Sequence, residues 1–253
     1  MNLTFLGTGT SQGVPMIACP CGVCSSTDRR NQRLRTSALL SHNGTSICID
    51  TGPDFRAQML REKVKRLDAV VYTHNHKDHT AGLDDVRAFN YCQQKEMPIW
   101  GDKLVLQALQ NEFAYVFTDT PYPGIPQVHL NEITDVPFFI NQLEILPINC
   151  LHYQLPIKGF RVEDITYITD ANYINDVELS KIKNTEILVI NALRQEKHIS
   201  HFTLKEAIDI AVQVNAKQTF FTHISHQLGL YADVQAQLPK NMYLAYDGLK
   251  IEI

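Results

Sequence analysis

The sequence lacks several features that would assign it to a membrane, secreted or serine-hydrolase class. No stretch of about 18 apolar residues occurs in the chain, so no transmembrane helix is expected. The first 13 residues show no basic segment followed by a long apolar run, so we expect no signal peptide and predict a cytoplasmic protein. No G-x-S-x-G motif is present. No Pro/Gly/Ser-rich linker, low-complexity segment or repeat divides the chain, and we predict a single domain over residues 1–253.

A broad basic surface is also missing. The formal net charge is -4, and the windows richest in Lys and Arg, residues 29–35 and 61–66, are short and isolated. Nucleic acid is therefore not an expected partner, although a small local basic site remains open. No membrane partner is expected. The hydrophobic content of 44% is enough to close a sizeable core.

The six cysteines are distributed unevenly. Cys19, Cys21 and Cys24 crowd into CPCGVC, whereas Cys48, Cys92 and Cys150 are isolated along the chain. Evenly scattered pairs would suit the disulfides of a secreted protein, but this distribution favours metal binding together with free thiols. Three thiolates provide most of a tetrahedral zinc site, and the sequence around them offers no fourth ligand.

Apolar and polar patterning predicts a layered α/β protein. Short β segments open the chain, and the nearly continuous apolar run at 68–74 is typical of a strand buried on both faces. A short helix is expected after Pro53, and two more at 82–94 and 103–113. Several β segments follow between about 127 and 170, interrupted by a loop at 150–155, and the last third alternates helix and strand.

The strongest chemical signal is THNHKDHTAG, which begins where the buried strand is expected to end. It contains His74, His76, Asp78 and His79 within six residues. Imidazole and carboxylate groups bind Zn²⁺ and similar ions at about 2.0–2.2 Å. On a continuous strand the first three side chains would face one way and His79 the other, whereas a loop would let Asp78 and His79 serve a second ion beside the first.

Three further candidate ligands follow apolar runs in the same manner. His152 comes after LEILPINCL, Asp170 ends ITYITD and His223 ends QTFFTH. Strands that each finish in a potential ligand suit a site assembled at one edge of a sheet. For His152 alone, a solvated loop histidine is the alternative interpretation.

Together these motifs resemble the metallo-β-lactamase superfamily. The segment 74–79 matches its H-x-H-x-D-H motif without departure, and the resemblance extends over nearly the whole chain. Other matching segments are 3–15, 47–56, 167–174, 220–226 and 244–249. The branch that it resembles is the PhnP-like phosphodiesterases, with ribonuclease Z a more distant relative. This resemblance implies a four-layer αβ/βα sandwich.

The resemblance also implies a ligand set for two catalytic ions. His74, His76 and His152 would bind one ion, and Asp170 would bridge the two. Asp50 would not bind a metal itself, but its carboxylate would orient a metal-binding loop. That role is compatible with an Asp that forms the turn. The ligands implied for the second ion are Asp78, His79 and His223.

In PhnP-like proteins a similar cysteine triplet is completed by a histidine just beyond the last catalytic one, which here is His226. The resemblance therefore implies a closed structural Zn²⁺ site formed by that residue with Cys19, Cys21 and Cys24. Reduced, metal-free cysteines are the alternative.

HISHFTLKEAI places His201 near the start of a helix opened by Phe202 or Thr203. By resemblance, His201 would stabilise or protonate the leaving oxygen, with His198 as its nearby competitor. A helix-capping or solvent-facing role is the alternative for both. His42 and His129 lie beside turns or in alternating β segments without a constellation around them, and we interpret both as structural.

The resemblance thus implies a phosphodiesterase that uses a hydroxide held between two Zn²⁺ or Mn²⁺ ions, with Asp78 and Asp170 fixing it, on a small or cyclic phosphodiester. A ribonuclease Z-like endonuclease is the first alternative, although no long Gly- and Lys-rich insertion is present to clamp transfer RNA. A non-catalytic zinc-binding or coenzyme-biosynthesis protein on the same fold is the second. A homodimer is left open.

Overall fold

The computed structural model describes residues 1–118 and 123–253. Their contacts group into two compact units, each assembled from separate stretches of chain. The first unit contains residues 1–6, 37–134 and 248–253, and the second contains residues 7–36 and 135–247. The single-domain organisation stays a prediction. Among the described residues, no helix is long and apolar enough to cross a membrane.

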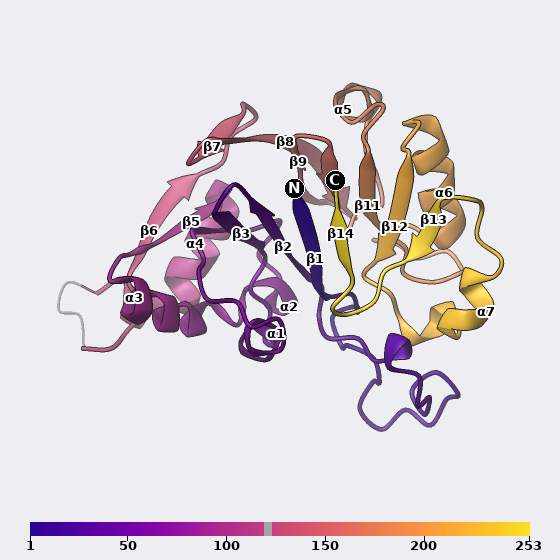
Figure 1. Ribbon diagram of the computed structural model, residues 1–253, viewed down its shortest axis with the longest axis horizontal. Helices are drawn as coiled ribbons and strands as arrows, with labels where there is room; N and C mark the ends of the chain where they lie inside the picture. Colours follow the sequence, from indigo (N-terminus) through magenta and orange to yellow (C-terminus); the bar gives the residue numbers. More distant parts are fainter. Residues whose placement is uncertain (119–122) are drawn as a thin grey trace. The chain divides into compact units, whose positions relative to one another are not determined.

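The first unit is built on one mixed sheet, which has seven strands among the described residues (Figure 1). Its β2–β3 pair is antiparallel, β3 to β6 run parallel, and β14 adds to β1 in the antiparallel sense. In sheet order the strands are β14 (Lys250–Glu252), β1 (Asn2–Gly7), β2 (Ser37–His42), β3 (Thr45–Ile49), β4 (Ala69–Val71), β5 (Met97–Gly101) and β6 (Val128–Glu132). The helices are α1 (Phe55–Arg61), α2 (Lys77–Thr80), η2 (Leu83–Val86), α3 (Arg87–Gln93), α4 (Lys103–Glu112) and η3 (Ala114–Val116).

The second unit contains another mixed sheet, again with seven strands in the described part of the chain. Strands β7 to β10 form an antiparallel meander, and β10 to β13 run parallel. In sheet order they are β13 (Met242–Leu244), β12 (Gln218–Thr222), β11 (Ile187–Asn191), β10 (Ile165–Tyr167), β9 (Leu155–Val162), β8 (Leu143–His152) and β7 (Phe138–Ile140). The helices are η1 (Arg29–Asn31), α5 (Asp176–Lys181), α6 (Leu204–Gln213), η4 (His226–Leu228) and α7 (Tyr231–Gln235).

Strand direction gathers the candidate ligands of each unit at one edge of its own sheet. In the first unit Asp50 follows β3 and Thr73 follows β4, and these strands are parallel neighbours. In the second unit Asp170 follows β10 and His223 follows β12. Since β8 runs parallel to β10 across the antiparallel β9, His152 at the end of β8 reaches the same edge.

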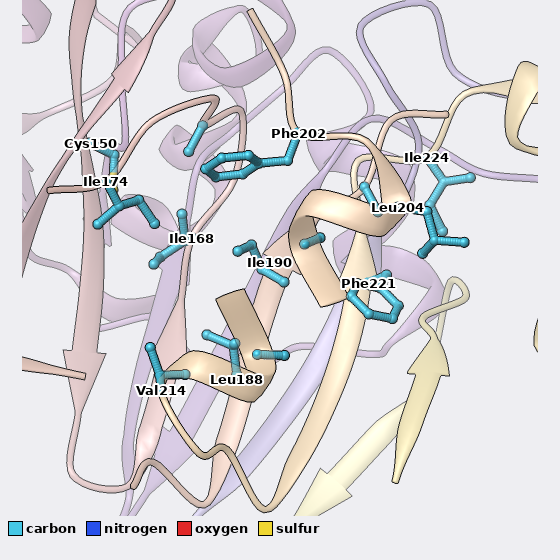
Figure 2. Packing of buried hydrophobic residues seen from close by; sticks show 14 of the residues in the cluster. Cys150, Ile168, Ile174, Leu188, Ile190, Phe202, Leu204, Val214, Phe221 and Ile224 are labelled. Carbon is cyan, nitrogen blue, oxygen red and sulfur yellow. The ribbon is translucent and has the colours of Figure 1, made fainter. Parts of the chain in front are cut away.

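A continuous apolar core supports the edge of the second unit. Helix α6 packs on β11 and β12, and the side chains of Ile190, Leu204 and Phe221 belong to one buried cluster (Figure 2). Thr203 caps α6 through a capping box with Glu206, which fixes where this helix begins. His201 therefore precedes the helix N-terminus, as the sequence predicted.

The structure corrects one expectation about local conformation and refines another. Residues 150–155 were expected to form a loop, but β8 continues to His152 and only two residues separate it from β9. Full pairing of His152 with Leu155 explains the difference, because the strands close in a tight hairpin. Phe55, Met59 and Leu60 are the apolar residues that suggested a helix after Pro53, and of these the helix α1 buries Phe55 and Met59 but leaves the side chain of Leu60 exposed.

Candidate metal centre

A buried carboxylate organises the ligand loop of the first unit. Asp50 is fully buried and accepts hydrogen bonds from the Thr73 amide at 2.8 Å, the Thr73 hydroxyl at 2.8 Å and Nδ1 of His79 at 2.7 Å. Burial raises the pKa of Asp50, and the nearby His79 and the Thr73 donors oppose that rise. Three donors around one carboxylate fix both the loop after β4 and the ring of His79.

These bonds also determine which nitrogen of each histidine carries its proton. A carboxylate only accepts, so His79 must donate from Nδ1. The Thr73 hydroxyl gives its single proton to Asp50, so its 3.0 Å contact with Nδ1 of His74 requires that His74 donates. In both rings the lone pair therefore lies on Nε2, the arrangement that a metal-ligating imidazole needs.

The four motif residues of the first unit lie together. The ring centroids of His74 and His76 are 4.7 Å apart, and those of His74 and His79 are 4.2 Å apart. Oδ2 of Asp78 lies 3.2 Å from Nε2 of His79, a separation that fits two ligand atoms on one ion about 2.0–2.2 Å from each. His76 is exposed, whereas His74 and His79 are buried.

Gly82, at the end of the motif, lets this loop approach the turn after β3. Its amide donates to the Thr51 carbonyl at 2.8 Å, and a Cβ at position 82 would lie 2.2 Å from the carbonyl oxygen of Gly52. Only glycine therefore fits against the segment that carries Asp50.

Three candidate residues adopt a left-handed backbone conformation. The φ angles are +62° at Asp50, +60° at Asp170 and +53° at His223, each just after a strand. This region is uncommon for residues other than glycine, and such conformations concentrate at functional sites. The turn redirects each side chain at the point where its strand stops.

In the second unit, the backbone fixes the ring of His152. Its Nδ1 lies 2.7 Å from the Asp170 carbonyl and 2.9 Å from the Ser200 carbonyl. Carbonyl oxygens only accept, so Nδ1 carries the proton and the lone pair again lies on Nε2. His152 thus has the same tautomer as His74 and His79.

Asp170 lies at the centre of the histidines of the second unit. Its Oδ2 accepts from the Thr169 hydroxyl at 2.7 Å, while Oδ1 lies 3.0 Å from Nε2 of His223 and 3.8 Å from Nδ1 of His201. Ligand atoms of Asp170, His152 and His201 all lie within 4.8 Å of one another. The geometry therefore also offers His201 as a metal ligand, a role that the sequence did not predict.

The surroundings of His201 favour its neutral form. Burial and the adjacent His223 lower the pKa of His201 to about 3, although Asp170 opposes the shift. The ring stacks with that of His223 at 4.9 Å and lies 5.1 Å from the ring of His198. A neutral imidazole donates a hydrogen bond but carries no positive charge, so stabilising a leaving oxygen fits this environment better than full protonation of it.

The cysteine triplet meets the predicted fourth ligand. Sγ of Cys19 and Sγ of Cys21 lie 3.4 and 3.3 Å from Nδ1 of His226, and all four ligand atoms, including that of Cys24, lie within 4.8 Å of one another. Ligand atoms at Zn–S of about 2.3 Å and Zn–N of about 2.1 Å on a tetrahedron are roughly 3.5 Å apart. The hydrogen bond with His226 lowers the pKa of Cys21 to about 6, whereas burial raises that of Cys24 to about 11. The donor set fits Zn²⁺.

Sequence reasoning missed the threonines that precede the candidate ligands. Thr73 and Thr169 are buried and bind Asp50 and Asp170 directly. Their signal was present in the sequence, because each immediately precedes a candidate ligand, in THNH and in ITD.

Comparison with known proteins defines the class. Residues 45–224 match the "Beta-lactamase superfamily domain" family. The chain belongs to the metallo-β-lactamase superfamily, and its two mixed sheets flanked by helices are the α/β sandwich of that fold. Members of this fold family bind divalent metals, typically zinc, and the His/Asp residues described above form a possible site for them.

Within the superfamily, the chain is similar to a crystal structure described as a new diphosphatase from the PhnP family. The two are 38% identical with a TM-score of 0.94, covering 100% of this chain and 97% of the other. An octanoyltransferase of Porphyromonas gingivalis is 39% identical over 99% of this chain and 51% of its own length. A ribonuclease Z of Anoxybacillus flavithermus is 26% identical over 64% of this chain and 48% of its own. The chain therefore spans about half the length of these two curated relatives.

Proposed function

We propose that this protein is a metal-dependent hydrolase of small phosphodiesters, including diesters of diphosphate. The observation that supports the proposal is the whole-length similarity to a PhnP-family diphosphatase, combined with histidines whose tautomers suit metal binding. In a phosphodiester and in a diester of diphosphate, the bond that breaks joins a leaving oxygen to an anionic phosphoryl group. One catalytic arrangement would therefore serve both substrates.

In the proposal, His74, His76, Asp78 and His79 are metal ligands provided by the first unit, and His152, Asp170 and His223 are metal ligands provided by the second. When bound, divalent ions supply Lewis acidity that polarises a phosphoryl oxygen and acidifies water. Asp50 holds the ring of His79, and the carbonyls of Asp170 and Ser200 hold the ring of His152. In each ring Nε2 is then available as the ligand atom. His201 donates a hydrogen bond to the departing oxygen, and the buried Asp170 lies beside the ring, with its Oδ1 3.8 Å from Nδ1 of His201.

The test is hydrolysis by the purified protein supplied with Zn²⁺ or Mn²⁺. The substrates are bis(p-nitrophenyl) phosphate, cyclic nucleotides, a dinucleoside diphosphate and a transfer-RNA precursor. His76→Ala should lose about 100-fold or more in rate and one equivalent of bound metal. His129→Ala is the matched control, because His129 is exposed on β6 and outside the ligand cluster. Failure of the wild type on all these substrates would refute the proposal.

The role of His201 is tested on two leaving groups. His201→Ala should retain its metals and lose roughly 10²–10⁴-fold on an alkyl diester, and less on a p-nitrophenyl diester, whose leaving group needs little assistance. His198→Ala should lose much less. Loss of metal in His201→Ala would instead assign it as a ligand.

Two of the relatives suggest alternative activities, which the same set of substrates can test. Similarity to ribonuclease Z keeps RNA processing as the second candidate, which the transfer-RNA precursor tests. The octanoyltransferase is about twice as long as the region that this chain matches. Its name therefore does not assign acyl transfer to this chain, but it makes acyl chemistry an activity to test. An octanoyl thioester is therefore added, and its turnover without phosphodiester hydrolysis would favour acyl chemistry.

A further inference from the structure

The connection between β11 and α6 forms a loop that is closed at its base. The Leu193 amide donates to the Phe202 carbonyl, and the Leu204 amide donates to the Arg194 carbonyl, both at 3.0 Å. The residues between these bonds include His198 and His201. Because the base is pinned by the backbone, the positions of both histidines depend on what holds the interior of the loop.

One guanidinium group supports that interior. Nε of Arg194 donates to the Glu196 carbonyl at 3.2 Å and Nη2 donates to the Lys197 carbonyl at 3.0 Å. Nη1 donates to Oε1 of Gln227 at 2.8 Å. A planar fork with fixed donor directions suits three acceptors spread over two segments, and the single ammonium of lysine does not.

The link to Gln227 reaches the cysteine cluster. Gln227 follows His226 in the short helix η4, and its amide donates to the Ser225 hydroxyl at 3.0 Å. The Ser225 amide in turn donates to the Leu193 carbonyl at 3.0 Å, at the base of the loop. Arg194 and the backbone thus connect the His226 segment to the loop through two separate hydrogen-bond routes.

The opposite side of the loop is attached to the candidate metal centre. Nδ2 of Asn172 donates to the Ile199 carbonyl at 3.2 Å, and Nδ1 of His152 donates to the Ser200 carbonyl at 2.9 Å. The Ser200 amide contacts Nδ1 of His198 at 3.3 Å. Arg194 holds residues 196 and 197, and these contacts hold 199 and 200. His198 lies between the two sets of contacts, and His201 follows directly after the second and before Phe202, whose amide donates to the Ala171 carbonyl at 2.8 Å.

We propose that Arg194 is a positioning residue that orients His201 for departure of the leaving group and couples this loop to the Cys19–Cys21–Cys24–His226 cluster. The part of the proposal that concerns the leaving group rests on the function proposed above. The part that concerns the order of the loop does not.

The experiment uses Arg194→Ala, with Arg161→Ala as the matched control. Arg161 is also a carbonyl clamp, donating to Glu163 at 3.1 Å and Lys181 at 2.8 Å from the end of β9 opposite Leu155. Arg194→Ala should speed hydrogen exchange across residues 194–204 about tenfold. Its kcat on an alkyl diester should fall about tenfold, with KM within about twofold and a smaller loss on the p-nitrophenyl diester. Arg161→Ala should change neither measurement at this loop.

Two further measurements separate positioning from general loss of stability. Added guanidinium ion at millimolar concentration should partly restore kcat to Arg194→Ala and leave Arg161→Ala unchanged. Gln227→Leu removes only the link to the cluster and should move exchange and kcat in the same direction by about threefold. Wild-type behaviour of Gln227→Leu would overturn the coupling to the cluster.

Wild-type exchange and an unchanged leaving-group dependence in Arg194→Ala would overturn the positioning role. If the wild-type protein hydrolyses none of the phosphodiesters but Arg194→Ala still loosens the loop, the proposed function fails while the order imposed by Arg194 stands. Equal losses in Arg194→Ala and Arg161→Ala on both substrates would assign the effect to folding.

Discussion

Replacing Asp50 by asparagine should disable His79 as a proposed metal ligand without changing the shape of the core. The two side chains are nearly isosteric, and the site is fully buried. The amide oxygen of the introduced side chain can still accept from the Thr73 amide, which lies 2.8 Å from Oδ1 in the wild type. Its NH₂ group then faces Nδ1 of His79, which lies 2.7 Å from Oδ2 of Asp50. Two donors cannot share that contact.

The ring of His79 should resolve the conflict by moving its proton to Nε2 and accepting at Nδ1. This removes the lone pair from the atom that the proposed metal site uses. Loss of such an orienting partner typically costs 10–100-fold in metal affinity or activity, which corresponds to about 1.4–2.7 kcal/mol. Asp50→Ala should be worse for stability, because it leaves a cavity and also removes the acceptor of the Thr73 amide, which asparagine keeps.

The decisive assay is nitrogen NMR of the His79 ring, together with metal titration. Wild-type protein should show protonated Nδ1, and Asp50→Asn should show protonated Nε2 with weakened binding of Zn²⁺. The NMR measurement needs no assumption about the substrate. An unchanged tautomer with a loss of affinity of about 10-fold or more, or a switched tautomer with wild-type affinity, would refute the reasoning.

The other predictions concern packing, the cysteine cluster and the charge of a buried carboxylate. Gly82→Ala should lower the free energy of unfolding by about 1–3 kcal/mol, because its Cβ would meet a backbone oxygen, whereas Gly22→Ala, with open space around its Cβ, should be nearly neutral in chemical denaturation. Cys21→Ser should lower the thermal midpoint more than the rate of the chemical step, and an unchanged midpoint with full zinc content would contradict a structural site. Burial alone would raise the pKa of Asp68, but Arg66 and the Ser46 amide lower it overall. Asp68→Asn should therefore be less stable than wild type above about pH 4, and melting curves should converge as acid protonates the carboxyl in the wild type.

Most of the elements that carry the site could be predicted from local sequence pattern. The apolar run before His74 becomes β4, and the spacing of Leu83, Val86 and Phe89 marks the buried side of η2 and α3. Helix α6 begins after Thr203, one of the two residues expected to open it. These features are local, so a window of about ten residues contains the information.

Two strands escaped prediction for physical reasons. Strand β5 contains Pro98, which cannot donate to a ladder and weakens any strand pattern. Strand β14 has three residues and gains its pairing only from β1, at the opposite end of the sequence.

The tautomers of the candidate ligands and the proposed role of Arg194 also could not be predicted from the sequence. They depend on partners such as Asp50 with His79, 29 residues apart, and Arg194 with Gln227, 33 residues apart. The cysteine cluster is the exception, because its fourth ligand, His226, came from family resemblance rather than from spacing.

The pairing of β1 with β14 makes the order of synthesis matter for the first unit. All of the second unit, residues 7–36 and 135–247, leaves the ribosome before the last strand of the first unit does. Until residues 250–252 are made, β1 presents an unpaired edge, and exposed strand edges invite association with other chains. Residues 248–253 are therefore the last part of the first unit to be made, and they cover the edge of β1. A nascent chain that stalls before them would leave this edge exposed to aggregation.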